Sequence, residues 1–229
     1  MRKIFYLIVM LLLSTTTTFA QTSFSSNVSS FTKLKVDGNI VLTLIKSDES
    51  KFDIELTNID SERFQWVVED GEVSFKLRNT IIAKKDVVET AKITLYYNEI
   101  AEISAVSGAK VLAENTIEET SITLELSNKS VISLEVQTKD IKINAFNALV
   151  TISGTTEFST IRSTGGASVN CSNLSSTSVY VRSTTNAECY IWAIDKIDAK
   201  ANSNSNIFYK GDPEIKTISS STLGAVQKY

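Results

Sequence analysis

Hydrophobic and polar residues alternate with a period of two along most of the chain. Typical runs are LKVDGNIVLTL (34–44), KFDIEL (51–56), EVSFKL (72–77) and AKITLYY (91–97). Such alternation places one side of a strand in a core and the other in water, whereas a helix repeats its apolar residues every three or four positions. The pattern therefore predicts an all-β protein. The least regular stretch, NTIIAKKDVVET at 79–90, is expected to be a loop or an irregular edge.

The second half of the chain repeats a turn signal at intervals of 18 to 20 residues. The positions are Gly108, Asn128, Asn147, Gly166, Asn186, Asn204 and Thr222. Six of the seven are Gly or Asn, the residues that most readily accept a positive φ. Three residues after each position comes an apolar one: Val111, Val131, Val150, Val169, Cys189, Ile207 and Ala225. The coincidence predicts left-handed corners, each followed by a core position.

Two further columns of residues support the repeat. Two positions past the first core column lie Ala113, Ser133, Ile152, Cys171, Ile191, Tyr209 and Gln227, of which Ser133 and Gln227 suit a core poorly. Before the corner, Ile161, Val181 and Ala199 share one register. We interpret the pattern as a β-solenoid (a β-helix-like stack) with coils of about 19 residues, in which each coil buries its apolar side against its neighbours at roughly 4.8 Å. Asn side chains at the corners are expected to form amide ladders.

Residues 21–100 differ from the repeat region 101–229. They have longer strands, more irregular spacing, and turn signals at Asp37-Gly38-Asn39 and Asp70-Gly71, the latter inside the hairpin-like FQWVVEDGEVSFKL. Because a stack of strands leaves bare edges at its ends, we expect 21–100 to be a β layer that caps the stack. Two arrangements stay open: a separate β domain, or wider coils of one continuous domain, 21–229.

The first 20 residues have the pattern of a secretory signal peptide. Arg2 and Lys3 precede an apolar run from Ile4 to Leu13, and Thr18-Phe19-Ala20 resembles a cleavage site. The run is shorter than the roughly 20 residues that span a bilayer, and no second run of that length follows. The sequence therefore predicts an exported protein of the periplasm, the cell surface or the extracellular space, without a membrane segment in the mature chain.

Composition removes several function classes. The net charge is −3 and becomes −5 without residues 1–20, which hold two of the 23 basic residues and none of the 26 acidic ones; nucleic acid is therefore a poor partner. The chain has no histidine, which excludes Ser-His-Asp and Cys-His catalysis. Metal signals and cofactor motifs are lacking, so we expect no cofactor. Cys171 and Cys189 occupy different columns, so Cys189 is expected to be a buried apolar side chain and a disulfide is not expected.

Several segments resemble the family of the putative auto-transporter adhesin, head GIN domain. They are FTKLKVDGNIVLTLIKSDESKFDIEL, EISAVSGAKV, the GGASV-like turns and IFYKGDPEIKTISSSTLGAVQK, with YKGDP at 209–213 the most specific. The resemblance spans about 31–227, and Asn or Thr replaces several of the family's corner glycines. It implies an all-β, solenoid-like fold in an exported cell-envelope protein, mostly from Bacteroidetes. It implies no enzyme activity, since the family was long a domain of unknown function.

Two groups of outward positions are candidate binding surfaces. Tyr190, Trp192 and Phe208, with Lys210 in the register of Trp192, are expected to point out of neighbouring coils. They predict an apolar patch for a sugar ring or a partner protein, unless the N-terminal layer or the tail covers them as ordinary core. Arg162, Arg182 and Lys200 form a second column. This column predicts a strip for an anionic glycan or an acidic partner, unless neighbours such as Asp198 and Asp195 neutralise it.

The leading hypothesis is a non-catalytic, exported envelope protein that binds a glycan or an envelope protein. The first rival is a polysaccharide-active enzyme that uses carboxylates on one face of a coil, although the acidic residues share no register. The second rival is a purely structural envelope component. The sequence leaves the ligand and the oligomeric state open.

Overall fold

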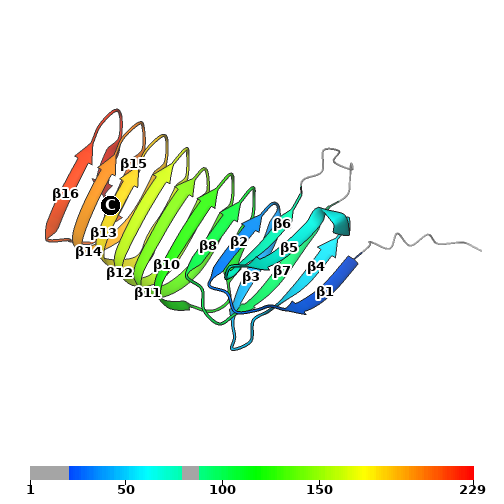
Figure 1. Ribbon diagram of the computed structural model, residues 1–229. Coiled ribbons are helices and arrows are strands. Elements are labelled where there is room, and N and C mark those ends of the chain that lie inside the picture. Colours follow the sequence, from blue (N-terminus) through cyan, green and yellow to red (C-terminus); the bar gives the residue numbers. More distant parts are fainter. Residues whose placement is uncertain (1–20, 79–87) are drawn as a thin grey trace, which may run out of the picture.

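The computed structural model describes residues 21–78 and 88–229 (Figure 1). The predicted signal peptide and most of the predicted loop at 79–90 lie outside the described residues. The N-terminal elements are β1 (Gln21–Asn27), β2 (Lys33–Asp37), β3 (Ile40–Lys46), β4 (Lys51–Thr57), the short 3-10 helix η1 (Ser61–Arg63), β5 (Phe64–Glu69), β6 (Glu72–Leu77) and β7 (Thr90–Tyr97). They are followed by β8 (Glu102–Val106), β9 (Lys110–Ala113), β10 (Ile117–Ser127), β11 (Val131–Phe146), β12 (Leu149–Thr164), β13 (Ser168–Ser183), β14 (Glu188–Ala201), β15 (Asn206–Lys210), β16 (Ile215–Ser220) and β17 (Ala225–Lys228). The all-β prediction is confirmed.

The strands wind into a flattened β-solenoid with two faces, and Figure 1 shows the coils side by side from β16 to β1. A long strand such as β12 contributes its first half to one face, bends near Gly154, and contributes its second half to the other. The first face, sheet A, contains β1, β4, β7, β3, β9, the first halves of β11 to β14, β15 and β17. The second face, sheet B, contains β5, β6, β2, β8, most of β10, the second halves of β11 to β14, and β16.

The predicted corners are confirmed. All seven predicted positions have a positive φ, from 47° at Asn147 to 85° at Gly108. Corners of successive coils are hydrogen-bonded to each other: the Gly108 N–H donates to the Asn128 carbonyl at 3.0 Å. The Asn204 side-chain amide donates to Asn186 Oδ1 at 2.8 Å, so this pair forms the expected ladder. The column of Ile161, Val181 and Ala199 is buried and in register, as predicted.

One coil departs from the predicted register by one residue. Val131 is only half-buried, and the buried Ile132 pairs with Val150 in the core column instead. The reason is that most corners contain two consecutive residues of positive φ, and the core position comes three residues after the second of them. Asn128 is the first of its pair and is followed by Lys129, so the core position moves from Val131 to Ile132. In four other coils the residue counted in the sequence is the second of the pair: Gly108, Gly166, Asn186 and Asn204.

The last coil shows the same shift. Thr222 is followed by a second positive-φ residue, Leu223, so Val226 rather than Ala225 continues the column of Ile207. The shift also removes the two polar residues from the neighbouring column. Ser133 and Gln227 are exposed, and the places next to Ile152 and Tyr209 belong to Leu134 and Lys228.

Both sheets continue from the repeat region into the N-terminal region. β2 pairs in parallel with β8 and β6, and β3 pairs in parallel with β9 and β7. Beyond them, β4, β1 and β5 pair antiparallel. The division of the chain near residue 100 stays a prediction.

Aromatic side chains from both sheets close the core at the N-terminal end. The ring of Phe52 on β4 lies 4.9 Å from Trp66 on β5 and 5.2 Å from Phe75 on β6, both edge to face. Phe24 on β1 adds a third edge contact to Phe52 at 6.1 Å. Large rings thus fill the space that another coil would fill.

The last coil at the C-terminal end has lysines at two of its core-column positions. Lys216 continues the core column of Ile197 on β16, and Lys228 continues that of Tyr209 on β17. The Lys228 ammonium contacts the Asp212 carboxylate, and this hydrogen bond lowers the pKa of Asp212. Lysines on an inward column oppose the stacking of a further coil, because the charges would be buried.

The bend glycine is expected to be essential to the coil. Gly154 has a φ of +110°, and a Cβ there would lie 2.0 Å from the Val136 carbonyl oxygen. Gly154→Ala should lower the free energy of unfolding by about 3 kcal/mol or more in urea titration, because strain and clash add. The matched control is Gly166→Ala, at a φ of +76° with no atom within 4 Å, which should cost about 1–2 kcal/mol. Equal losses would contradict the role of the clash.

The inward lysines are expected to keep the C-terminal end from associating. The double variant Lys216→Ile/Lys228→Val should form larger species than the wild type in sedimentation velocity, with a dependence on concentration. Lys92→Ile/Lys110→Val changes two exposed lysines on the outer side of sheet A and is the control. Identical sedimentation of the first variant and the wild type would show that the lysines do not protect this end.

Candidate functional site

The predicted aromatic residues lie together on the outer side of sheet A. Tyr190 and Trp192 come from β14, and Phe208 and Lys210 pair with them in register from β15. Their neighbours in sequence point inward and are buried: Cys189, Ile191, Ile207 and Tyr209. The alternation of the strand therefore turns the candidate side chains toward solvent. We call these four residues and Tyr229 the aromatic cluster.

The cluster is held together by ring contacts. Tyr190 and Phe208 stack with centroids 4.9 Å apart and planes at 17°, and Tyr229 meets Tyr190 edge-on at 5.9 Å. The Lys210 ammonium lies 4.5 Å from the centre of the Trp192 ring, a cation–π contact. The Tyr190 hydroxyl donates to Glu188 at 2.9 Å, which raises the pKa of Tyr190.

The rings do not form the broad flat surface that the sequence suggests. Tyr190, Trp192 and Phe208 are each half-buried. Tyr190 and Phe208 stack on adjacent strands, so one face of each ring is covered by the other ring. The N-terminal strands lie at the other end of the stack (Figure 1). Sequence reasoning missed Tyr229, because the predicted register of the last coil was wrong by one residue.

The basic column lies on the other face. Arg162, Arg182 and Lys200 are in register on the outer side of sheet B, on β12, β13 and β14. The structure therefore does not bring the basic column and the aromatic cluster together. Because the same strands contribute to both sheets, the two groups are back to back on neighbouring coils.

Only the central residue of the basic column has an acidic partner among the described residues. Arg182 lies 2.8 Å from Asp198, and its guanidinium covers the ring of Tyr180 at 3.7 Å. Arg162 and Lys200 are exposed and form no ion pair within the described ranges. Neutralisation by Asp198, the alternative considered from the sequence, thus applies to one of the three cations.

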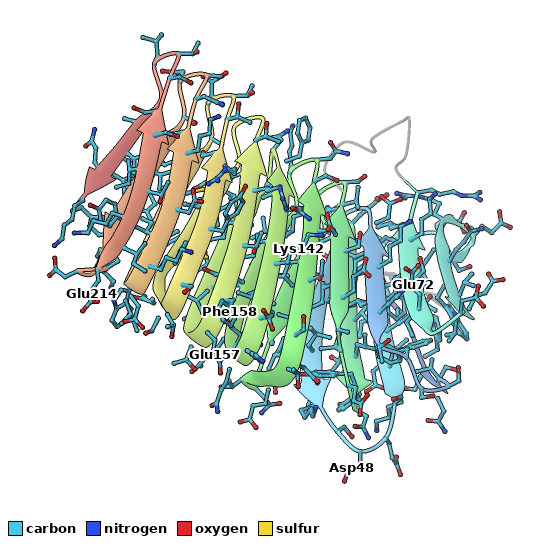
Figure 2. All side chains as sticks on the ribbon, turned by 60° about the vertical axis from the view of Figure 1, so that its left-hand side comes forward. Asp48, Glu72, Lys142, Glu157, Phe158 and Glu214 are labelled. Atoms are coloured by element: carbon cyan, nitrogen blue, oxygen red, sulfur yellow. The ribbon has the colours of Figure 1, made fainter. Side chains whose placement is uncertain are left out.

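Exposed aromatic residues that sequence reasoning missed flank the basic column. Phe158 is 47% exposed and Tyr180 is 36% exposed. They border a hollow of about 230 Å³ together with Ser178, Lys196 and Asp198. Figure 2 shows Phe158 on this side of the molecule, with Lys142 on the same face. The signal was present in the sequence, since Phe158 and Thr160 alternate with inward positions up to Ile161.

A second hollow lies on the other side of Arg162. It has a volume of about 390 Å³ and is bordered by Glu125, Asn144 and Phe146, the last being 50% exposed. The Asn144 side-chain amide donates to Glu125 Oε1 at 2.6 Å. Arg162 therefore stands between two shallow hollows, each with one exposed phenylalanine.

The two cysteines are buried inside the stack and carry free thiols. Cys189 Sγ lies 2.8 Å from Ser163 Oγ, and burial raises the pKa of Cys189 from 9.0 to about 11. Burial raises the pKa of Cys171 still further. A thiol that stays protonated and buried is a poor nucleophile, so Cys189 is the buried apolar side chain expected from its column.

Within the described ranges, no three acidic or cysteine residues are grouped so as to hold a metal ion. The described part of the chain also has no helix that is long and apolar enough to cross a membrane.

These features define a class of protein: a two-faced β-solenoid that presents ordered rows of side chains on flat outer surfaces. The chain belongs to the family "Putative auto-transporter adhesin, head GIN domain", whose model matches residues 30–213. The resemblance seen in the sequence is confirmed.

Solved structures share the fold. A putative adhesin from Bacteroides fragilis NCTC 9343 is 19% identical over 92% of this chain and 97% of its own, with a TM-score of 0.83. A putative adhesin from Parabacteroides merdae ATCC 43184 is 14% identical over 91% and 96%, with a TM-score of 0.71. A putative lipid binding protein from Parabacteroides distasonis ATCC 8503 is 14% identical over 91% and 96%, with a TM-score of 0.66. No curated protein matches the chain.

Stability should fall at alkaline pH, in part through Cys189. Its pKa is raised in the folded state, so the contribution is complete below about pH 9 and is lost as the pH rises toward about 11. The free energy of unfolding should fall by up to about 2–3 kcal/mol from this thiol. Urea titrations at several pH values should show a smaller fall for Cys189→Val, which keeps the Ser163–Ser183 hydrogen bond. Equal pH dependence in both proteins would contradict the assignment.

Proposed function

We propose that this protein is a non-catalytic, exported module of the cell envelope that binds a partner protein through the aromatic cluster. Membership of an adhesin-type family supports a binding role and export. The observation that carries the proposal is the continuous group of outward aromatic side chains on the last three coils of sheet A, far from the N-terminal cap.

The composition of the cluster suits a protein interface. Tyr and Trp combine a large apolar area with a polar atom and are enriched among the residues that dominate binding energy. Stacking and the Lys210 contact already restrict the side chains, so less conformational entropy is lost on binding.

The geometry favours a protein over a sugar at this surface. A sugar ring stacks on the face of an aromatic ring, but Tyr190 and Phe208 turn faces toward each other, and Lys210 covers a face of Trp192. The Tyr190 hydroxyl and Glu188 add a hydrogen-bonded polar pair beside the rings. An apolar centre with polar groups at its rim is typical of protein interfaces.

The experiment is co-purification from native membranes, followed by affinity measurements with the recovered protein. Trp192→Ala and Tyr190→Ala should each weaken binding by about tenfold or more, as expected for central interface residues. Tyr96→Ala is the control, because Tyr96 is also a half-buried tyrosine with a cation, Lys51, 4.6 Å from its ring centre. Unchanged affinity in both cluster variants would exclude this surface. Release of reducing ends from envelope glycans would instead support the enzymatic alternative.

A further inference from the structure

We propose that the outer side of sheet B binds an acidic polysaccharide, and that this site is independent of the aromatic cluster. The site, here called the basic face, consists of Phe158, Arg162, Tyr180, Arg182, Lys196 and Lys200. Its ligand is a polymer of sugars that carries carboxylate or sulfate groups.

Strand register arranges the basic face in three rows. Phe158, Ser178 and Lys196 form the first row, and Thr160, Tyr180 and Asp198 form the second. The third row is Arg162, Arg182 and Lys200. Neighbouring residues in a row are roughly 4.8 Å apart, and neighbouring rows are roughly 7 Å apart. The cations are therefore close enough to act together within a Debye length of about 10 Å.

Cations outnumber carboxylates within the three rows of the basic face. The rows contain four cations and one carboxylate, Asp198, which Arg182 holds at 2.8 Å. Asp140 is exposed in register with Phe158, on the strand that borders the first row. Glu157 and Asp195 lie at the bend beside the face, and neither forms an ion pair in the described part of the chain. Like charges on adjacent strands repel each other. The chain as a whole has a net charge of −3, so the positive charge gathered on this face is a local feature, and it favours binding of a polyanion there.

The first hollow provides the place for a sugar ring. Ser178 has a small side chain between Phe158 and Lys196 in its row, which leaves the hollow of about 230 Å³. This volume is below the range of drug-sized pockets and suits a single ring. Phe158 offers an apolar wall that is 47% exposed, and Lys196 offers a cation for the acidic group of the sugar.

The second hollow indicates a polymer rather than a small ligand. It begins at Arg162, where the basic face ends, and combines the exposed Phe146 with the polar pair Asn144 and Glu125. An amide and a carboxylate are acceptors for sugar hydroxyl groups. Each hollow has one exposed phenylalanine, and the second adds hydrogen-bonding groups for sugar hydroxyls, so the face offers places for more than one sugar unit.

The test uses affinity electrophoresis of the mature chain with four polymers. They are polygalacturonate for carboxylates, dextran sulfate for sulfates, uncharged dextran, and poly-glutamate as an acidic polypeptide. We expect retardation by polygalacturonate or dextran sulfate, whichever acidic group the face accepts, and none by dextran. Arg162→Ala/Lys200→Ala should weaken binding by at least tenfold and make it less dependent on salt, because fewer counterions are released.

Two further variants distinguish the contribution of apolar contact to polysaccharide binding from the contribution of charge. Phe158→Ala should weaken binding with the salt dependence unchanged, since it removes apolar contact alone. Lys92→Ala/Lys110→Ala removes two exposed lysines from sheet A, so its net charge matches that of the basic-face variant. It should bind as the wild type does. Circular dichroism and thermal melting confirm that each variant is folded.

Three results would overturn the proposal. They are no retardation by either acidic polysaccharide, equal weakening in the sheet A control, and binding of poly-glutamate as tight as that of the polysaccharide. The last result would assign the face to an acidic protein. Tyr190→Ala distinguishes this site from the proposed protein interface, because it should leave polysaccharide binding intact.

Discussion

Parallel, in-register stacking of the coils is the constraint on which the rest of the structure depends. A single coil has two short strands and cannot bury its own apolar side chains, so each coil is stable only against its neighbours. The stacking fixes what each position does. Inward residues such as Val150 and Val169 lie against each other in a buried column, and outward residues such as Arg162 and Arg182 form rows on the surface. The corners make this arrangement possible, because the chain turns there within one or two left-handed residues.

The same constraint leaves the coil at each end of the stack without a neighbour on one side, and the two ends differ in how the exposed core positions are treated. At the N-terminal end the chain changes from parallel to antiparallel pairing, and the rings of Phe52, Trp66 and Phe75 fill the space between the sheets. At the C-terminal end two of the core-column positions, Lys216 and Lys228, are lysines, so that a further coil would have to bury charge. Apolar filling closes one end, and charge discourages growth at the other.

The sequence was informative where the backbone restricts residue type. Positive φ favours Gly and Asn, so the corners could be located at all seven positions, and the core column followed for five of them. The register of the other two could not be derived, because most corners have two left-handed residues and either one can be the conspicuous residue of the repeat. Lys129 and Leu223 are unusual residues for that conformation and gave no signal. The N-terminal pairing of β4 with β1 and β7 was also beyond reach, since antiparallel pairing between distant segments leaves no periodic trace.

For the surface, the sequence predicted which residues share a row more reliably than it predicted the orientation of their side chains. The register of Tyr190 with Phe208 and of Arg162 with Arg182 follows from the repeat. The orientation of the rings, and which of the three cations pairs with Asp198, depend on side-chain conformations that the repeat does not specify.

Two outer faces built on the same strands can serve two ligands. β14 carries Tyr190 and Trp192 on sheet A and Lys200 on sheet B, and its inward residues Cys189 and Ala199 belong to the common core. Because side chains alternate along a strand, either outer face can change its residues without altering an inward column. The sheets are separated by a packed, largely apolar interior roughly 10 Å thick. Its buried polar contacts, such as Ser163 Oγ with Cys189 Sγ at 2.8 Å, are short and local. Because the two proposed sites share no residue and lie on opposite sides of this interior, binding on one face should be additive with binding on the other.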